Sequence, residues 1–166
     1  PTNWELADSN DLNPAKMASG QTIALLIRHQ TTDVSATDAN AAETFTRTIN
    51  IFDPYQGQLQ PIIQTATFHR SAIKDLVTGI VTYGSWVPAQ GNFVKVEIPT
   101  VAGYTPDKQV NDENVDPLKG KDEVIDIHYQ ANDGNIQEID YVDQDGNVVN
   151  HVNLSGKTDS VAKINY

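Results

Sequence analysis

The side chains that could do chemistry are scattered along the sequence. The four histidines occur singly and share no spacing that would place two of them on one metal ion: His29, His69, His128 and His151. No serine stands in a Gly-x-Ser-x-Gly turn, and no glycine-rich phosphate loop is present. Carboxylates are abundant, but nothing in the sequence singles out two of them as an acid–base pair. The sequence therefore predicts no catalytic residues.

Two acidic stretches contain the oxygen ligands that Ca²⁺ prefers. The stretch from Asp143 to Asn147 begins like a calcium loop, but Leu154 stands where an EF-hand needs its acidic twelfth residue. A hairpin turn explains the same residues more simply. The second stretch could bind Ca²⁺ weakly or could be a solvated loop. The weak calcium candidates are Asp112, Glu113, Asp116, Asp143 and Asp145, and we expect no other metal or cofactor.

Three aromatic residues near turns and strand ends are candidates for contact with a glycan. They are Tyr55, Trp86 and Tyr104. The C–H face of a sugar stacks on an aromatic ring, while nearby Asn, Asp and Gln side chains bond to its hydroxyls. Tyr55 lies at the tip of a predicted turn, so we expect it to be exposed. For Trp86 and Tyr104, packing within the fold is the alternative role, because large aromatic side chains are mostly buried.

The composition limits the partners. The 166 residues carry a formal net charge of −11, with a pI near 4.5. Because an acidic surface repels phosphates and anionic lipids, nucleic acid and membranes are poor partners. There is no cysteine, which excludes a disulfide scaffold and a thiolate metal site. The polar composition with few Lys and Arg favours an extracellular location, and we expect any export signal or wall anchor outside this sequence.

Short alternating apolar runs between turns predict a mainly β fold with little helix. Predicted strands cover 23–29, 45–51, 62–70, 77–86, 93–98 and 124–129. In the second of these strands, Phe45, Arg47, Ile49 and Ile51 share one face. A turn follows at 53–57, and a long loop is expected at 105–121. Residues 136–143 and 148–154 predict a further hairpin, and Asp159 could cap a short helix that carries Val161 and Ile164.

Residues 46–110 resemble the second half of the mucus-binding (Mub) repeat of lactobacillus surface adhesins, of the MucBP type. The matching positions are Thr46-Arg47-Thr48-Ile49, Gln64-Thr65 with Phe68 and Arg70, Val77-Thr78-Gly79 with Val81-Thr82-Tyr83, Trp86, and Pro99 with Gly103 to Asp107. So many matches in order make the resemblance specific. It implies β-grasp-like subdomains, each a mixed sheet around little helix.

The two ends of the chain resemble the two halves of the other Mub subdomain. Residues 138–166 resemble its start and residues 2–32 its finish, so the subdomain is divided between the termini. We therefore expect three parts: 1–33 with 131–166 as a first-type subdomain, 34–44 as a linker, and 45–130 as a second-type subdomain. Because either terminal piece alone would expose a sheet edge and half a core, we expect the ends to assemble with each other, within one chain or between chains.

The resemblance implies an extracellular adhesion module that binds mucin glycoproteins or their glycans. It also allows immunoglobulin as a partner, and it implies neighbouring repeats and attachment to a Gram-positive cell wall through the parent protein. The alternative is a structural spacer in the stalk of such an adhesin, which would need stiffness but no binding site. Substituting exposed aromatic residues such as Tyr55 separates the two hypotheses.

Overall fold

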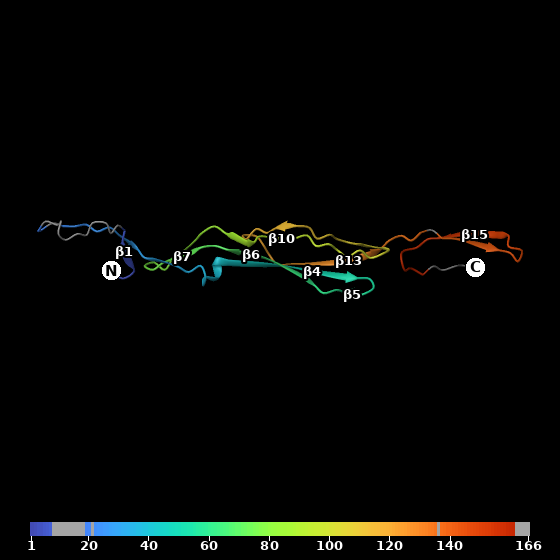
Figure 1. The fold of residues 1–166 in the computed structure, drawn as a ribbon, viewed down its shortest axis with the longest axis horizontal. Coiled ribbons are helices and arrows are strands. Elements are labelled where there is room, and N and C mark those ends of the chain that lie inside the picture. The colour runs from blue at the N-terminus through green and yellow to red at the C-terminus, as the bar shows by residue number, and fades with distance from the viewer. Residues whose placement is uncertain (8–18, 21, 136, 162–166) are drawn as a thin grey trace. The chain divides into compact units, whose positions relative to one another are not determined.

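The computed structural model describes residues 1–7, 19–20, 22–135 and 137–161, and it confirms a mainly β fold (Figure 1). Within this described part, helix is limited to the 3₁₀ turn Ala39–Ala41. The chain divides into two compact units. The first unit contains Pro1–Phe45, Ala66–Gly91 and Asp116–Lys119, and the second contains Thr46–Thr65, Asn92–Val115 and Gly120–Tyr166.

The largest sheet is mixed, as the resemblance implied. Its strands lie in the order Tyr104–Pro106 (β11), Glu123–Ala131 (β13), Ala42–Asp53 (β4), Ile62–His69 (β6) and Val87–Gln90 (β9), with Gly57–Gln58 (β5) pairing with β4. β13 runs parallel to β4, whereas β11 is antiparallel to β13. Two strands far apart in the sequence thus form the centre of the sheet.

The alternation of β4 places its apolar side chains on one face, as predicted. Phe45, Arg47, Ile49 and Ile51 are all buried. In the second unit, Ile49 and Ile51 pack with Val110 and Ile127, and this core is flanked by Leu59, Ile62, Val96, Ile98, Ile125 and Tyr129. Successive side chains of a strand point to opposite faces, so the apolar alternation in the sequence is sufficient to place this core.

In the first unit the short strands differ from those predicted. Trp4–Leu6 (β1) pairs with Ile27–His29 (β2), and Thr31–Asp33 (β3) pairs with Ala72–Asp75 (β7), which pairs with Val81–Tyr83 (β8). Residues 23–26 are exposed and outside any strand, so the strand predicted at 23–29 is confirmed only at Ile27–His29. The strand predicted at 77–86 is reduced to β8, because a turn at 76–78 and Gly79, with φ of 77°, occupy its first residues.

Three further segments differ from the secondary structure predicted for them. Most of the predicted linker 34–44 is ordered by a turn, the 3₁₀ turn capped by Asp38, and the start of β4, and Ala41 is buried. The predicted loop 105–121 contains most of β11, the fully buried Val110, and Glu113–Asn114 (β12), which pairs with Asn92–Phe93 (β10). The strand predicted at 93–98 is reduced to β10 and a bridge between Val96 and Val110.

The hairpin near the C-terminus is confirmed. Gln137–Val142 (β14) pairs with Val148–Leu154 (β15) around a turn in which Gly146 has a φ of 85°. Asp159 has a φ of 58° instead of the extended backbone of an N-cap, so it does not cap a helix. Residues 162–166, which include Ile164 and would form most of the predicted helix, lie outside the described residues, and the helix stays a prediction.

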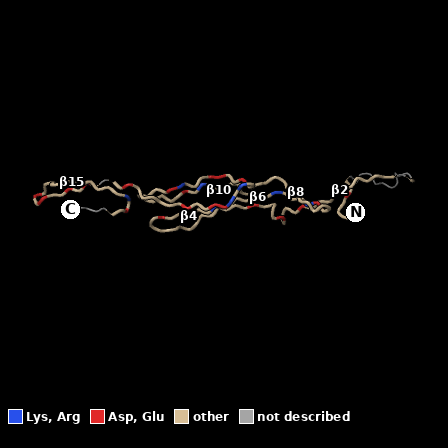
Figure 2. Tube along the Cα trace, turned by 180° about the vertical axis from the view of Figure 1, so that it is seen from behind, with Lys and Arg blue, Asp and Glu red and all other residues tan. Residues whose placement is uncertain are grey.

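Charge is distributed as the composition predicts. Acidic positions occur along the strands and turns of both units, and Lys and Arg occur at fewer places (Figure 2). No helix among the described residues is long and apolar enough to span a bilayer.

An ion pair near the start of the first unit gives a pH-dependent prediction. Asp75 Oδ2 lies 2.7 Å from His29 Nδ1, and Asp75 Oδ1 accepts hydrogen bonds from the amides of Val77 and Thr78. These contacts, that with His29 above all, lower the pKa of Asp75 from 3.8 to about 2. The stability that the pair contributes should therefore be complete above pH 3.8 and be lost as the pH falls through about 2.

Carbon-detected NMR titration of the Asp75 carboxyl tests this pair. We expect the pKa near 2 in the natural chain and a rise toward 3.8, without reaching it, in His29→Gln, because the two amide donors remain. An unchanged Asp75 pKa in His29→Gln would show that the imidazole makes no contribution.

Candidate functional site

The structure brings together two of the three aromatic glycan candidates, Tyr55 and Tyr104. Their rings lie 5.7 Å apart between centroids and nearly perpendicular, in an edge-to-face contact. Both hydroxyls donate to one oxygen of Asp159, at 2.9 Å from Tyr55 and 2.8 Å from Tyr104. We call these three residues the tyrosine pair site, and all three belong to the second unit.

Turn chemistry places Tyr55 at the surface. The buried Asp53, at the end of β4, accepts hydrogen bonds from the amides of Tyr55 and Gln56 through Oδ1. Gly57, with φ of 76°, then returns the chain into β5. The Tyr55 side chain keeps 64% of its exposure, so one ring of the pair remains open to a ligand.

Tyr104 and Asp159 are positioned by the backbone. Tyr104 begins β11 opposite Ala131 of β13. The amide of Asn132 donates to Gly103 O and the amide of Thr158 donates to Asn132 O, each at 2.8 Å. A Cβ on Gly103 would come within 2.6 Å of the Thr158 side chain, so glycine is required for this close approach.

The carboxylate of Asp159 favours the protonated form of both phenols. Hydrogen bonding to Asp159 raises the pKa of Tyr104 to about 12 and also raises the pKa of Tyr55. The site therefore offers an exposed aromatic ring beside a carboxylate. Such a combination can stack on the C–H face of a sugar and accept hydrogen bonds from its hydroxyls.

Trp86, the third aromatic candidate, belongs to the first unit and has different neighbours. The Arg70 guanidinium lies over both the Trp86 ring, at 4.4 Å, and the Tyr83 ring, at 4.1 Å. Arg70 Nε donates to the Asn40 carbonyl, and the Tyr83 hydroxyl donates to Asp38. Trp86 is half-buried, and its indole nitrogen has no hydrogen-bond partner among the described residues. This arrangement favours the packing role.

The calcium candidates have structural partners. Asp143 Oδ1 accepts hydrogen bonds from the amides of Asp145 and Asn147, which lowers its pKa and closes the hairpin turn; Asp145 itself is exposed. Asp112 accepts from the amide of Lys95, Glu113 pairs with Arg47, and Asp116 accepts from the amide of Leu118. Weak calcium binding stays a prediction.

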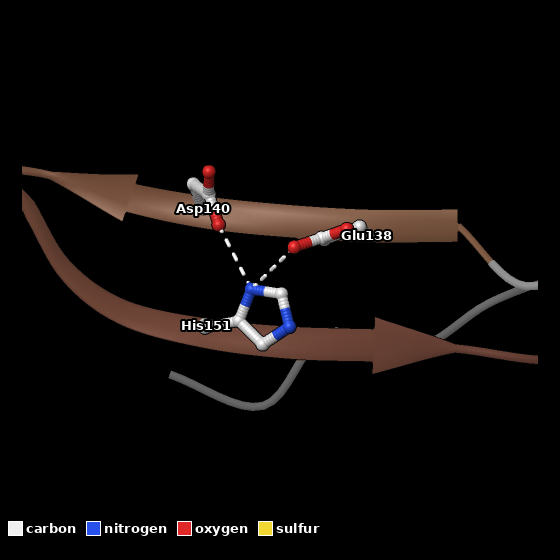
Figure 3. Close-up of side chains that lie close together, drawn as sticks. All are labelled: Glu138, Asp140 and His151. Carbon is white, nitrogen blue, oxygen red and sulfur yellow. Dashed lines mark hydrogen bonds and ion pairs between the residues drawn. The ribbon is translucent and has the colours of Figure 1, made fainter.

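A further cluster, which was not predicted from the sequence, lies on the β14–β15 hairpin. His151 Nδ1 lies 2.9 Å from Asp140 Oδ1 and 3.0 Å from Glu138 Oε1 (Figure 3). The histidines were judged by spacing along the chain, whereas this contact is made across strands, where Asp140 is directly opposite His151. Counting outward from the turn would pair Asp140 with Asn150, because a register shift between Tyr141 and Val142 is what brings His151 opposite Asp140. The sequence carries no signal for this shift, so the pair could not be found from the turn alone.

Comparison with known proteins identifies the family. The family model of the Muc B2-like domain matches residues 36–133, more than half of the chain. The chain belongs to the Muc B2-like domain family. This membership confirms the resemblance to mucus-binding repeats, and the family is one of adhesion domains, not enzymes. No curated protein matches this Muc B2-like chain.

The chain is also similar to several solved structures. The Muc B2-like chain is 34% identical to Mub-RV with a TM-score of 0.54, over 65% of this chain and 63% of Mub-RV, so it spans less than two thirds of that protein. It is 27% identical to the mucin-binding domain of Spr1345 from Streptococcus pneumoniae (TM-score 0.47, 61% of this chain and 95% of that one). It is 22% identical to the type 2 repeat of the mucus binding protein MUB from Lactobacillus reuteri (TM-score 0.46, 78% and 76%).

Proposed function

We propose that this Muc B2-like domain binds mucin glycoproteins through their glycans. The observation that carries the proposal is an exposed tyrosine ring beside a carboxylate, in a member of a mucin-binding family. The resemblance of residues 46–110 to mucus-binding repeats supports the same ligand class.

The tyrosine pair site suits a weak contact with a neutral sugar. Tyr55 supplies an open aromatic surface, and Asp159 supplies acceptors for sugar hydroxyls. Tyr104 holds the Tyr55 ring by its edge, which reduces the conformational entropy lost on binding. Because one such site is shallow, useful adhesion requires many copies, and tandem repeats supply them by raising the effective concentration.

The setting that this function requires is extracellular. In the proposal, the domain is displayed on a cell wall by its parent protein, among neighbouring repeats, and its acidic surface keeps it soluble at high local density. Immunoglobulin is a second protein partner that the resemblance allows. Binding to immunoglobulin can be measured separately, on a surface that carries immobilised immunoglobulin in place of mucin.

Mucin retention by Tyr55→Ala tests the proposal. The chain is displayed in many copies on beads, and retention on immobilised mucin is measured by the concentration for half-maximal binding. Loss of a stacking contact of about 0.5–1.5 kcal/mol should weaken each site by roughly 2- to 12-fold, and multivalent display amplifies this loss. Tyr55→Phe keeps the ring and should retain most binding.

Leu118→Ala is the matched control, because Leu118 is also a large side chain at the surface, 77% exposed. It should bind mucin like the natural chain. If Tyr55→Ala is retained as well as Leu118→Ala, the tyrosine pair site is not the contact. If the natural chain itself is not retained on mucin or on its released glycans, the spacer hypothesis replaces adhesion by this domain.

A further inference from the structure

The hairpin β14–β15 carries three potential metal ligands on one face. Glu138 and Asp140 are two residues apart on β14, so their side chains point to the same side. Asp140 is directly opposite His151 of β15, and Glu138 is its diagonal neighbour. All three side chains are exposed, and Figure 3 shows both carboxylates directed at the same ring nitrogen.

The carboxylates of Asp140 and Glu138 compete for the single hydrogen that Nδ1 of His151 can carry. Nδ1 of an imidazole carries at most one hydrogen, which can be directed well at one acceptor only. Here an oxygen of Asp140 and an oxygen of Glu138 both lie within 3.0 Å of it. Even with His151 protonated, the cluster keeps a net negative charge. A divalent cation would satisfy all three ligand atoms and neutralise both carboxylates.

We propose that Glu138, Asp140 and His151 bind a divalent transition-metal ion of the Zn²⁺ class on the exposed face of this hairpin. Imidazole nitrogen with carboxylate oxygen is a donor set that suits zinc, whereas Ca²⁺ prefers six to eight oxygens. His151 binds through Nδ1 in this arrangement and keeps its proton on Nε2.

Little movement is needed to accept the ion. With bonds of about 2.0–2.1 Å, neighbouring ligand atoms of a tetrahedral zinc site lie about 3.3 Å apart. The two separations from His151 Nδ1 are 2.9 and 3.0 Å, and all three ligand atoms lie within 4.8 Å of one another. Small rotations of exposed side chains can close the difference. Three protein ligands leave the fourth position open to water.

Binding would connect the two strands of the hairpin. An isolated two-stranded hairpin is marginally stable in water, and an ion held from both strands stabilises the paired state over the open one. Zinc should therefore slow exchange of those amide hydrogens that are bonded between β14 and β15.

The site is tested by calorimetric titration of the tag-free chain with ZnCl₂ in a buffer that does not bind zinc. ¹H–¹⁵N spectra of the histidine rings then show which histidine binds the ion. We expect one ion per chain and a selective shift of His151 Nδ1 on addition of zinc. His151→Ala, Glu138→Gln and Asp140→Asn should each weaken binding at least tenfold. His69→Ala is the matched control, since His69 is also an exposed strand histidine, and it should bind zinc like the natural chain.

Three results would overturn the site. They are an unshifted His151 ring in the natural chain at saturating zinc, equal zinc affinity in His151→Ala and His69→Ala, and displacement of zinc by equimolar Ca²⁺. The ring shift is read in the natural chain, so the test holds even if a variant opens the hairpin.

Discussion

Replacing Ile127 with Ala should lower the free energy of unfolding by about 2–5 kcal/mol. Ile127 is 0% exposed and packs with Ile49, Ile51 and Val110 in the core of the second unit. It lies on β13 directly beside Ile51 of the parallel β4. Removing its branched side chain forfeits apolar burial and leaves a cavity on the core face of the sheet, beside Ile49, Ile51 and Val110.

Urea denaturation followed by circular dichroism measures the effect. Val124→Ala is the control, because Val124 is on the same strand but on the opposite face, with 67% exposure. It should change the unfolding free energy by no more than about 0.5 kcal/mol. If both variants lost the same unfolding free energy, Ile127 would not be more buried than Val124, and the placement of the core on one face of β13 would be wrong.

The central strands could be predicted because each carries its own pattern. β4 and β13 alternate over most of their length, and this period alone identifies which side chains face the core. The turn at Asp53–Gly57 and the β14–β15 hairpin were predicted from turn residues that act locally. Such features need no knowledge of distant partners.

Elements that depend on distant partners were not predictable in the same way. Val110 is fully buried and bridges to Val96, yet it stands in a polar stretch without periodicity. β11 and β12 are two or three residues long, and each is a strand only because a partner strand lies beside it. In the opposite sense, Ile23 to Leu26 form an apolar run without a described partner strand, and they are exposed.

In the tyrosine pair site, too, some features depend on the local sequence and others on distant partners. The exposure of Tyr55 followed from its place in a turn, but its contact with Tyr104 follows from the order β11-β13-β4. Asp159 enters the site because the amide of its neighbour Thr158 donates to the Asn132 carbonyl, a contact for which the sequence has no signal. The assembly of 1–33 with 131–166 into one subdomain stays a prediction, since the family match covers 36–133.

The second large effect is expected at Arg47, the buried cation of β4. Arg47 is only 3% exposed. Its guanidinium lies 4.6 Å from the centre of the Phe93 ring and donates to the Asn111 carbonyl at 3.0 Å. Its remaining nitrogens pair with Glu113 and Glu123. Arg47→Ala removes the shared cation from two carboxylates and leaves a carbonyl without a donor. We expect it to cost about 3 kcal/mol, the low end for such pairs, because both carboxylates can be partly hydrated.

Arg47→Lys separates charge from geometry. A lysine keeps the positive charge, but a single ammonium cannot reach two carboxylates and a carbonyl in the directions that the planar guanidinium reaches, so about 1–2 kcal/mol should still be lost. Arg28→Ala is the control, because the Arg28–Glu5 pair is exposed and should contribute about 0–1 kcal/mol. If Arg47→Ala and Arg28→Ala cost the same in urea denaturation, burial adds nothing to the Arg47 network. If Arg47→Lys matches the natural chain, charge alone holds β12 and β13 to β4, and the fork geometry is dispensable.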